Sequence, residues 1–233
     1  ALQQSYFSYH NLAMAVNPLL AQDGATQSLF PMPEAGEAFV LKRDNIDFEC
    51  VLPRGGKLWG RGSFFLSSKR IVFVAGDKSC RQDFRSFAIP LQMLRKPKFE
   101  QPIFGPNYLA GSTKPLPGSE NDPAAVPLLG GDTVFYLTFR SGGCNTFLQL
   151  LYPLLSEVQA QREQGPIAQA AQEGRLNQVA YVDPSDPSVL YLSQPTAVAG
   201  SEERTNFEID APSAPPADGA GQPARANGNC LIS

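Results

Sequence analysis

The chain has 233 residues, of which 42% are hydrophobic and 18% are charged, so it can form one domain of ordinary size and a further segment. Its single histidine, His10, excludes histidine-rich metal centres and argues against a catalytic triad. No window approaches the roughly 18 consecutive apolar residues of a membrane-spanning helix. The cysteines lack C-x-x-C spacing, which argues against a zinc ribbon or a dense disulfide scaffold.

Residues 1–35 are nearly uncharged, and the first charged residue is Asp23. No basic segment precedes an apolar run, so a secretory signal is not predicted. The absence of arginine argues against a mitochondrial presequence. We expect an irregular N-terminal arm with one short amphipathic turn around residues 12–20.

From Phe39 onward the sequence predicts β-strands. Apolar residues alternate with other residues between Ile46 and Leu52, which is the period of a strand with one buried face. Gly60 and Gly62 fall within the next strand pattern and predict a strong bend or a close approach of two backbones. The other predicted strands, separated by turn sequences, are 57–66, 70–75, 84–89, 97–111 (interrupted by prolines) and 134–140.

Residues 146–164 are the one good helix candidate, with Asn145 or Thr146 available as the N-cap. Pro153 predicts either a kink or a helix that begins at that proline. Residues 165–233 are rich in Ala, Pro, Gly and Gln, so we expect them to be disordered in isolation. The predicted organisation is an irregular arm (1–35), a β-rich domain (36–164) and a low-complexity tail (165–233).

About seven short strands followed by one amphipathic helix are typical of a PH-like β-barrel or sandwich, in which the helix closes one open end. Three stretches, within residues 30–163, carry a more specific resemblance. The run GSFFLSSKRIVF (62–73) resembles the hairpin of GRAM domains. The run FAIP (87–90) followed by QPIFGPNYLAG (101–111) resembles the WW domain-binding protein 2 family, as does YLTFRSGG (136–143) before the helix.

The resemblance implies a mainly β, PH-like GRAM fold with no enzymatic activity. We also expect no cofactor and no metal. In that family the folded part binds lipids or proteins, Pro-Pro-x-Tyr motifs in the tail recruit WW domains, and some members act as nuclear co-activators. This sequence departs from the pattern in the tail. Its one Pro-Pro pair, Pro215-Pro216, is followed by Ala217-Asp218.

The net charge of −3 conceals a division along the chain. Residues 40–115 hold 14 Lys and Arg against 6 Asp and Glu, a net charge of +8, so the remainder carries −11. Such a block either forms solvated strand faces and turns or docks on an anionic surface. We prefer anionic, phosphoinositide-type membrane lipid to nucleic acid, because the sequence lacks RNP, helix-turn-helix and zinc-finger signatures. The candidate lipid-binding residues are Arg54, Lys57, Arg61, Lys69 and Arg70.

The last four residues, Cys230-Leu231-Ile232-Ser233, match a C-a-a-X box, and serine at the final position favours a farnesyl group. We therefore predict that a prenyltransferase modifies Cys230. One lipid chain gives only marginal, reversible membrane binding, so a second signal is needed. The basic block is the candidate for that second signal.

We find no phosphate-binding loop and no dinucleotide fingerprint, since Gly60-Arg61-Gly62 lacks the third glycine of the motif. The sequence therefore favours a non-enzymatic peripheral membrane adaptor in the cytoplasm, tethered by its prenylated tail. A protein-interaction adaptor that binds partners through the tail, or a nuclear co-activator, is the first alternative. A structural subunit of a large assembly is the second.

Overall fold

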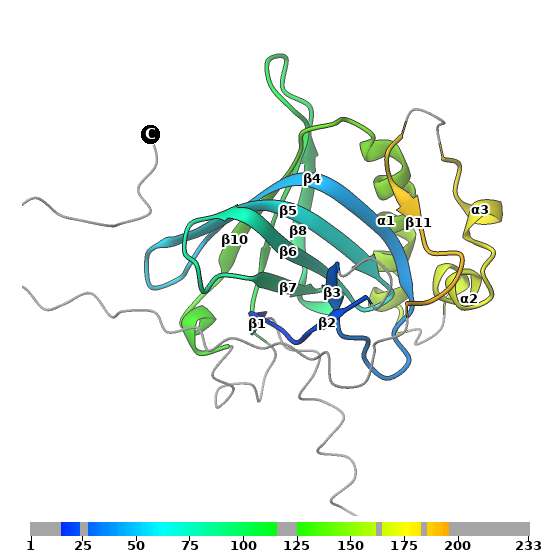
Figure 1. Ribbon diagram of the computed structural model, residues 1–233, viewed down its shortest axis with the longest axis horizontal. Helices are drawn as coiled ribbons and strands as arrows, with labels where there is room; N and C mark the ends of the chain where they lie inside the picture. The colour runs from blue at the N-terminus through cyan, green and yellow to red at the C-terminus, as the bar shows by residue number, and fades with distance from the viewer. Residues whose placement is uncertain (1–14, 24–27, 116–124, 162–164, 183–185, 196–233) are drawn as a thin grey trace, which may run out of the picture.

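The computed structural model describes residues 15–23, 28–115, 125–161, 165–182 and 186–195. It is dominated by one antiparallel sheet (Figure 1). The strands of this sheet are β1 (Ala15–Val16), β4 (Phe39–Val51), β5 (Lys57–Ser67), β6 (Arg70–Ser79), β7 (Ser86–Pro90), β8 (Arg95–Glu100), β9 (Tyr108–Thr113), β10 (Thr133–Phe139) and β11 (Val189–Leu190). Their order is β1-β7-β6-β5-β4-β10-β9-β8, and β11 pairs with β4.

The seven strands from β4 to β10 curl into a half-barrel with an apolar inner face. Ile46, Phe48 and Cys50 on β4 are at most 1% exposed, as their alternation predicts. Phe48 stacks on Phe73 of β6, with ring centroids 4.8 Å apart. The predicted mainly β class, with about seven strands and a following helix, is confirmed.

Gly62 explains why β5 and β6 can curl so strongly. The pairing of these strands shifts register between Arg61 and Gly62. A Cβ atom on Gly62 would lie 2.0 Å from the carbonyl oxygen of Val74, closer than any real contact allows. The close backbone approach predicted from the glycine pattern is therefore present at this bulge.

Helix α1 (Cys144–Gln159) packs its apolar face into the concave side of the sheet. Phe147 is fully buried, and its ring centroid lies 5.0 Å from that of Phe64 on β5. The helix runs through Pro153 and does not begin there. The predicted caps, Asn145 and Thr146, are wrong: Gly143, with φ of +66°, precedes the helix without a side-chain cap. Two 3₁₀ turns are also present, η1 (Leu91–Met93), which contacts α1, and η2 (Val126–Leu128), which precedes β10.

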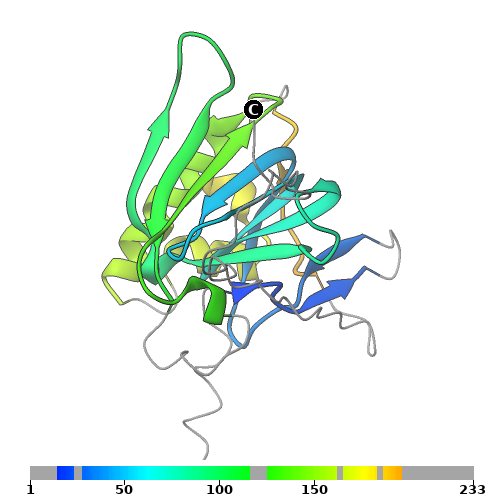
Figure 2. The ribbon, with the colours of Figure 1, turned by 90° about the vertical axis from the view of Figure 1, so that its left-hand side faces the viewer.

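The described part of the N-terminal arm is built into the fold. Strands β2 (Leu20–Gln22) and β3 (Leu29–Pro31) form a small second sheet, and β1 pairs with β7. Phe30 and its neighbours Leu20 and Ala21 bury outward-facing side chains of β5, β6 and β7, among them Phe65 and Val72. The arm, expected to be irregular, thus covers one half of the outer face of the main sheet (Figure 2).

The chain after residue 165 also differs from expectation. Helices α2 (Pro166–Gln172) and α3 (Leu176–Val179) follow α1, and Ala171 and Leu176 are fully buried. We call residues 186–195, which include β11, the C-terminal strap. Gln194 of the strap bonds both the backbone N–H and the carbonyl of Phe39. The expected disorder rested on the low apolar content of the tail itself, whereas these segments bury small side chains against surface that α1 and β4 supply. Residues 196–233, including Cys230, lie outside the described residues.

A buried ion pair fastens the strap to the half-barrel. Arg43 of β4 and Asp186 have side chains 0% and 3% exposed, and Nη1 lies 2.7 Å from Oδ1. Arg43 also donates to the hydroxyl of Ser188 and to the carbonyl of Gly142. Asp186 accepts a hydrogen bond from Thr146 at 2.7 Å, which explains why this threonine does not cap α1. One guanidinium therefore joins β4, the start of α1 and the strap.

Replacing Arg43 with Met is expected to lower the free energy of unfolding by about 3–5 kcal/mol, because Asp186 is left charged and buried without its partner. Urea denaturation measures the loss. The matched control is Lys42→Met on the same strand, whose partly exposed pair with Asp44 is worth at most about 1 kcal/mol. Equal effects of the two substitutions would show that the buried pair does not hold the strap.

Candidate functional site

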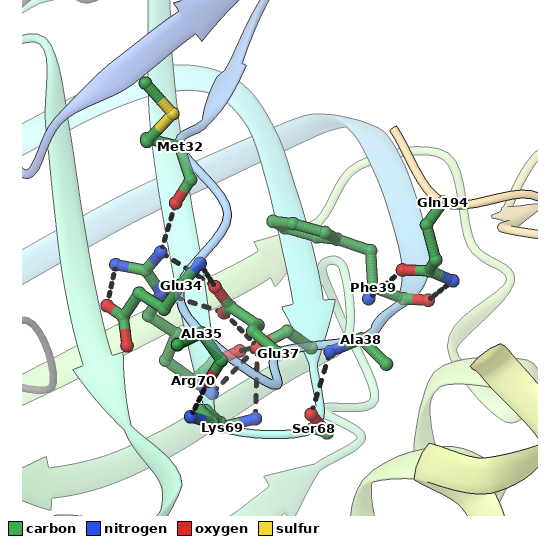
Figure 3. A network of polar contacts seen from close by, with 11 residues as sticks. Met32, Glu34, Ala35, Glu37, Ala38, Phe39, Ser68, Lys69, Arg70 and Gln194 are labelled. Atoms are coloured by element: carbon green, nitrogen blue, oxygen red, sulfur yellow. Dashed lines mark hydrogen bonds and ion pairs between the residues drawn. The ribbon is translucent and has the colours of Figure 1, made fainter. Parts of the chain in front are cut away.

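Arg70, predicted to bind lipid, is instead the centre of a buried network (Figure 3). Its side chain is 5% exposed, and its guanidinium lies 2.7 Å from Glu34 and 2.9 Å from Glu37. It also donates to the carbonyl of Met32 at 2.7 Å. A membrane headgroup cannot reach a guanidinium that is enclosed in this way. This enclosure argues against Arg70 as a lipid ligand and indicates that it anchors the connection between β3 and β4.

Lys69 and the serines of the β5–β6 turn extend the same network. The Lys69 ammonium donates to the carbonyl of Ala35 at 2.5 Å. The Ser68 hydroxyl accepts the N–H of Ala38, and the Ser67 hydroxyl donates to Glu37. Figure 3 shows how these contacts gather the loop before β4 around the turn between β5 and β6. The turn that resembles a GRAM hairpin thus acts here as a structural clamp.

Two carboxylates face one guanidinium in this clamp, and this has an electrostatic consequence. The pKa of Glu34 is raised to about 7: burial raises it most, the charge of Arg70 lowers it, the charge of Glu37 raises it and Lys69 lowers it. The folded protein therefore holds a proton on Glu34 over a pH range in which the unfolded chain, with a pKa near 4.5, has lost it. The contribution of Glu34 to the free energy of unfolding is therefore largest below about pH 4.5. It is lost as the pH rises through about 7.

Glu34→Gln is expected to flatten the fall in stability between pH 5 and pH 8 by an amount on the order of 2–3 kcal/mol, because the amide carries no charge at either pH. Urea unfolding of the native chain and the variant at several pH values measures the difference. Few other side chains change their charge between pH 5 and pH 8, since the chain has one histidine. Parallel pH profiles for the two proteins would contradict the assignment.

The other three predicted lipid ligands lie at the opposite end of β5 or along its exposed face. Arg54 is exposed in the β4–β5 turn. Lys57 lies 2.8 Å from Glu49, and Arg61 lies 2.7 Å from Asp47. Since β5 has 11 residues and separates Lys57 from the Lys69–Arg70 turn, the five residues form no single cluster.

The basic block as a whole is largely neutralised. At least eight of its fourteen cations pair with carboxylates: Lys42, Arg43, Lys57, Arg61, Arg70, Arg81, Lys98 and Lys114. Arg54, Lys78, Arg95 and Lys96 have no ion-pair partner within the ranges that the structure describes, and they lie on three separate segments. The charge that the sequence concentrates in residues 40–115 is thus distributed over several faces.

An open groove of about 720 Å³ lies on the half of the outer sheet face that the arm leaves uncovered. Trp59 of β5 and Tyr136 of β10 flank Glu49 of β4 in one row of the sheet. Two residues further along, Arg61 and Thr138 flank Asp47. Trp59 and Tyr136 are 37% and 36% exposed. The groove therefore has an aromatic row beside a charged row.

The charged row keeps a cationic excess. Asp47 accepts hydrogen bonds from both Arg61 and Arg140. Partial burial alone would raise the pKa of Asp47, but these two donors hold it below its usual value. Lys78, opposite Arg61 on β6, adds a third cation to the same end of the groove. Arg61 and Arg140 thus share one carboxylate, and together with Lys78 they leave this end of the groove with more positive than negative charge.

The sequence carries a signal for Trp59 that could have marked it as a candidate. Leu58, Gly60, Gly62, Phe64 and Leu66 share one parity of the strand pattern. Trp59 falls on the opposite, solvent-facing parity, where a large aromatic residue is unusual. Tyr136 and Arg140 could be recognised only once β10 was known to pair with β4.

The second candidate surface is the tip of the β8–β9 hairpin, which projects beyond the rest of the domain (Figures 1 and 2). Ile103 and Phe104 at this tip are 93% and 92% exposed. Below the tip the hairpin is well packed: Phe99 contacts the core, and Tyr108 and Tyr136 have ring centroids 6.1 Å apart. Two large apolar side chains are thus held in water on a rigid support.

The described residues show neither a metal centre nor a membrane span. No group of three or more His, Cys, Asp or Glu side chains among them could hold a metal ion. None of the helices in the described ranges has the length and apolarity needed to cross a bilayer.

Comparison with known proteins finds relatives but no matching family model. The chain is 32% identical over 124 residues to the postacrosomal sheath WW domain-binding protein of Bos taurus, covering 50% of this chain and 36% of the relative. It is 29% identical over 168 residues to WW domain-binding protein 2 of Homo sapiens, covering 70% and 55%. It is 30% identical over 99 residues to a stress-induced protein of Schizosaccharomyces pombe, covering 42% and 51%.

These identities confirm the resemblance to the WW domain-binding protein 2 family. The chain spans about half or less of the length of these curated relatives. Among solved structures, a chain of the 8S snRNP assembly intermediate aligns with a TM-score of 0.35 and 12% identity, covering 61% of this chain and 91% of that one. That similarity is too low to support an argument about fold or function.

Proposed function

We propose that this chain, a relative of the WW domain-binding protein 2 family, is a non-enzymatic adaptor that binds a protein partner through its folded domain. The names of the relatives describe protein binding, which supports the adaptor hypothesis over the membrane hypothesis. This chain lacks a Pro-Pro-x-Tyr motif, so WW-domain binding by the tail does not account for an adaptor role here. The proposal therefore places the contact on the folded domain.

The observation that carries the proposal is the exposed pair at the β8–β9 tip. Soluble domains rarely hold two adjacent large apolar side chains more than nine-tenths exposed. Such side chains become central anchors when a partner's pocket encloses them. The two nearest charged residues on β8, Lys98 and Glu100, form an ion pair with each other, so the tip has no cationic excess that would favour an anionic membrane.

A photo-crosslinking residue at position 104 tests this proposal in cells. We expect discrete protein adducts that are abolished by excess native chain but persist with an Ile103→Ser, Phe104→Ser competitor, because the competitor lacks the anchors. The same crosslinker at Glu173, which is exposed at the C-terminal end of α2, is the control and should give no such adduct. Labelling of phospholipid at position 104, with no protein adduct, would overturn the proposal.

Membrane attachment through Cys230 is a separate prediction. If the cysteine is farnesylated, Cys230→Ser should move the chain from the membrane fraction to the soluble fraction. The intact mass of the native protein, with three terminal residues lost and an isoprenoid gained, would identify the modification. An unmodified mass, together with an unchanged distribution of the Cys230→Ser variant, would contradict membrane attachment through Cys230.

A further inference from the structure

We propose that the groove on the uncovered half of the sheet binds an extended, acidic, proline-containing peptide segment of a partner protein. This surface is separate from the β8–β9 tip, so the two proposals can fail independently. The proposal rests on three features of the groove: an uncovered aromatic row, unused hydrogen-bond donors and a cationic end.

The first feature is the contrast between the two halves of the outer sheet face. On one half, outward-facing Phe65 and Val72 are 2% and 1% exposed because the N-terminal arm packs on them. On the other half, Val51, Trp59, Val134 and Tyr136 form neighbouring apolar positions that are each 36–38% exposed. No described segment of this chain covers them. The fold therefore leaves one apolar half-face open to another molecule.

The second feature is the chemistry of the aromatic row. Trp59, Tyr108 and Tyr136 each carry a polar hydrogen, and none of these three groups has a hydrogen-bond partner within the described ranges. A polyproline II segment is a natural complement, since its carbonyl groups make no internal hydrogen bonds and its proline rings pack on aromatic faces. The indole and phenol groups can therefore donate to the peptide while their rings contact proline.

The third feature is the position of the cations. Arg61, Lys78 and Arg140 gather at one end of the groove around the single carboxylate of Asp47. Along β4, Glu49 at the aromatic row lies two residues from Asp47, and Val51 beyond it lies four residues away, which is about 7 and 13 Å at the rise of a strand. In an extended peptide, about two to four residues cover that distance. The partner segment should therefore carry its acidic residue two to four positions from proline.

The same charges favour a peptide over a nucleic acid. Asp47 and Glu49 both line the groove, so a chain with a phosphate at every nucleotide would bring negative charge against them. A peptide with one acidic residue meets only the cationic end. The proposal therefore commits to protein, and binding of single-stranded RNA is an outcome that would overturn it.

Trp59 is the one tryptophan of the chain, so its fluorescence reports directly on the groove. The probe is the peptide acetyl-Gly-Ser-Pro-Pro-Ala-Ser-Glu-Ser-Gly-amide, titrated into the full chain. We expect a saturable change in Trp59 emission with a dissociation constant on the order of 100 μM. This is typical of a short flexible peptide, which loses conformational entropy when it binds. The affinity should fall as salt is added.

Substitutions separate the predicted contact from general attraction. Lys78→Gln and Arg140→Gln should each weaken binding of the Glu peptide about five- to tenfold and leave binding of a peptide with Gln in its place unchanged. Lys114→Gln, an exposed cation paired with Asp132 outside the groove, is the matched control and should have no effect. Unchanged thermal midpoints show that the variants fold.

Three outcomes would overturn the proposal. One is no saturable change of Trp59 emission at peptide concentrations up to about 1 mM. Another is equal affinity for the Glu and Gln peptides in the native chain. The third is a larger emission change with a single-stranded oligoribonucleotide than with the peptide. An Ile103→Ser, Phe104→Ser chain should bind the peptide normally, so a failed tip experiment and a failed groove experiment remain distinguishable.

Discussion

The curl of one long sheet is the constraint on which the rest of this structure depends. Because β5 and β6 approach closely at Gly62, the sheet bends into a half-barrel whose inner face needs a cover, and α1 provides it. The outer face is also apolar over β5, β6 and β7, and there the N-terminal arm serves the same purpose. Where the outer face lacks a cover, it presents the groove around Trp59.

Buried charge acts in this fold as a set of fasteners between segments that are distant in sequence. Arg43 holds the C-terminal strap, and Arg70 holds the loop that leads from the arm into β4. Each arginine is enclosed together with its carboxylates, so each contributes specificity of position at a cost in desolvation. The positive charge counted along residues 40–115 is consequently a poor guide to the charge that the surface presents.

The strands and the helix could be predicted from the sequence because their signals are local. Alternation from Ile46 to Leu52 and the apolar spacing before Pro153 depend only on neighbouring residues. The errors concern residues whose environment is set by distant segments. Arg70 follows a turn and was assigned to the surface, yet Glu34 and Glu37, more than thirty residues earlier, enclose it. Thr146 has the side chain of an N-cap, yet its hydroxyl donates a hydrogen bond to Asp186.

The pairing of β11 with residues Leu41 and Lys42 has a further consequence. Strand β10 pairs with β4 only from Ile46 onward, so the first part of β4 would otherwise present unpaired amide and carbonyl groups on that side. A free strand edge of this kind is a template for edge-to-edge association between molecules. A fragment that ends with α1 would lose this cover of the β4 edge, and it should therefore be more prone to self-association than a chain that includes residues 186–195.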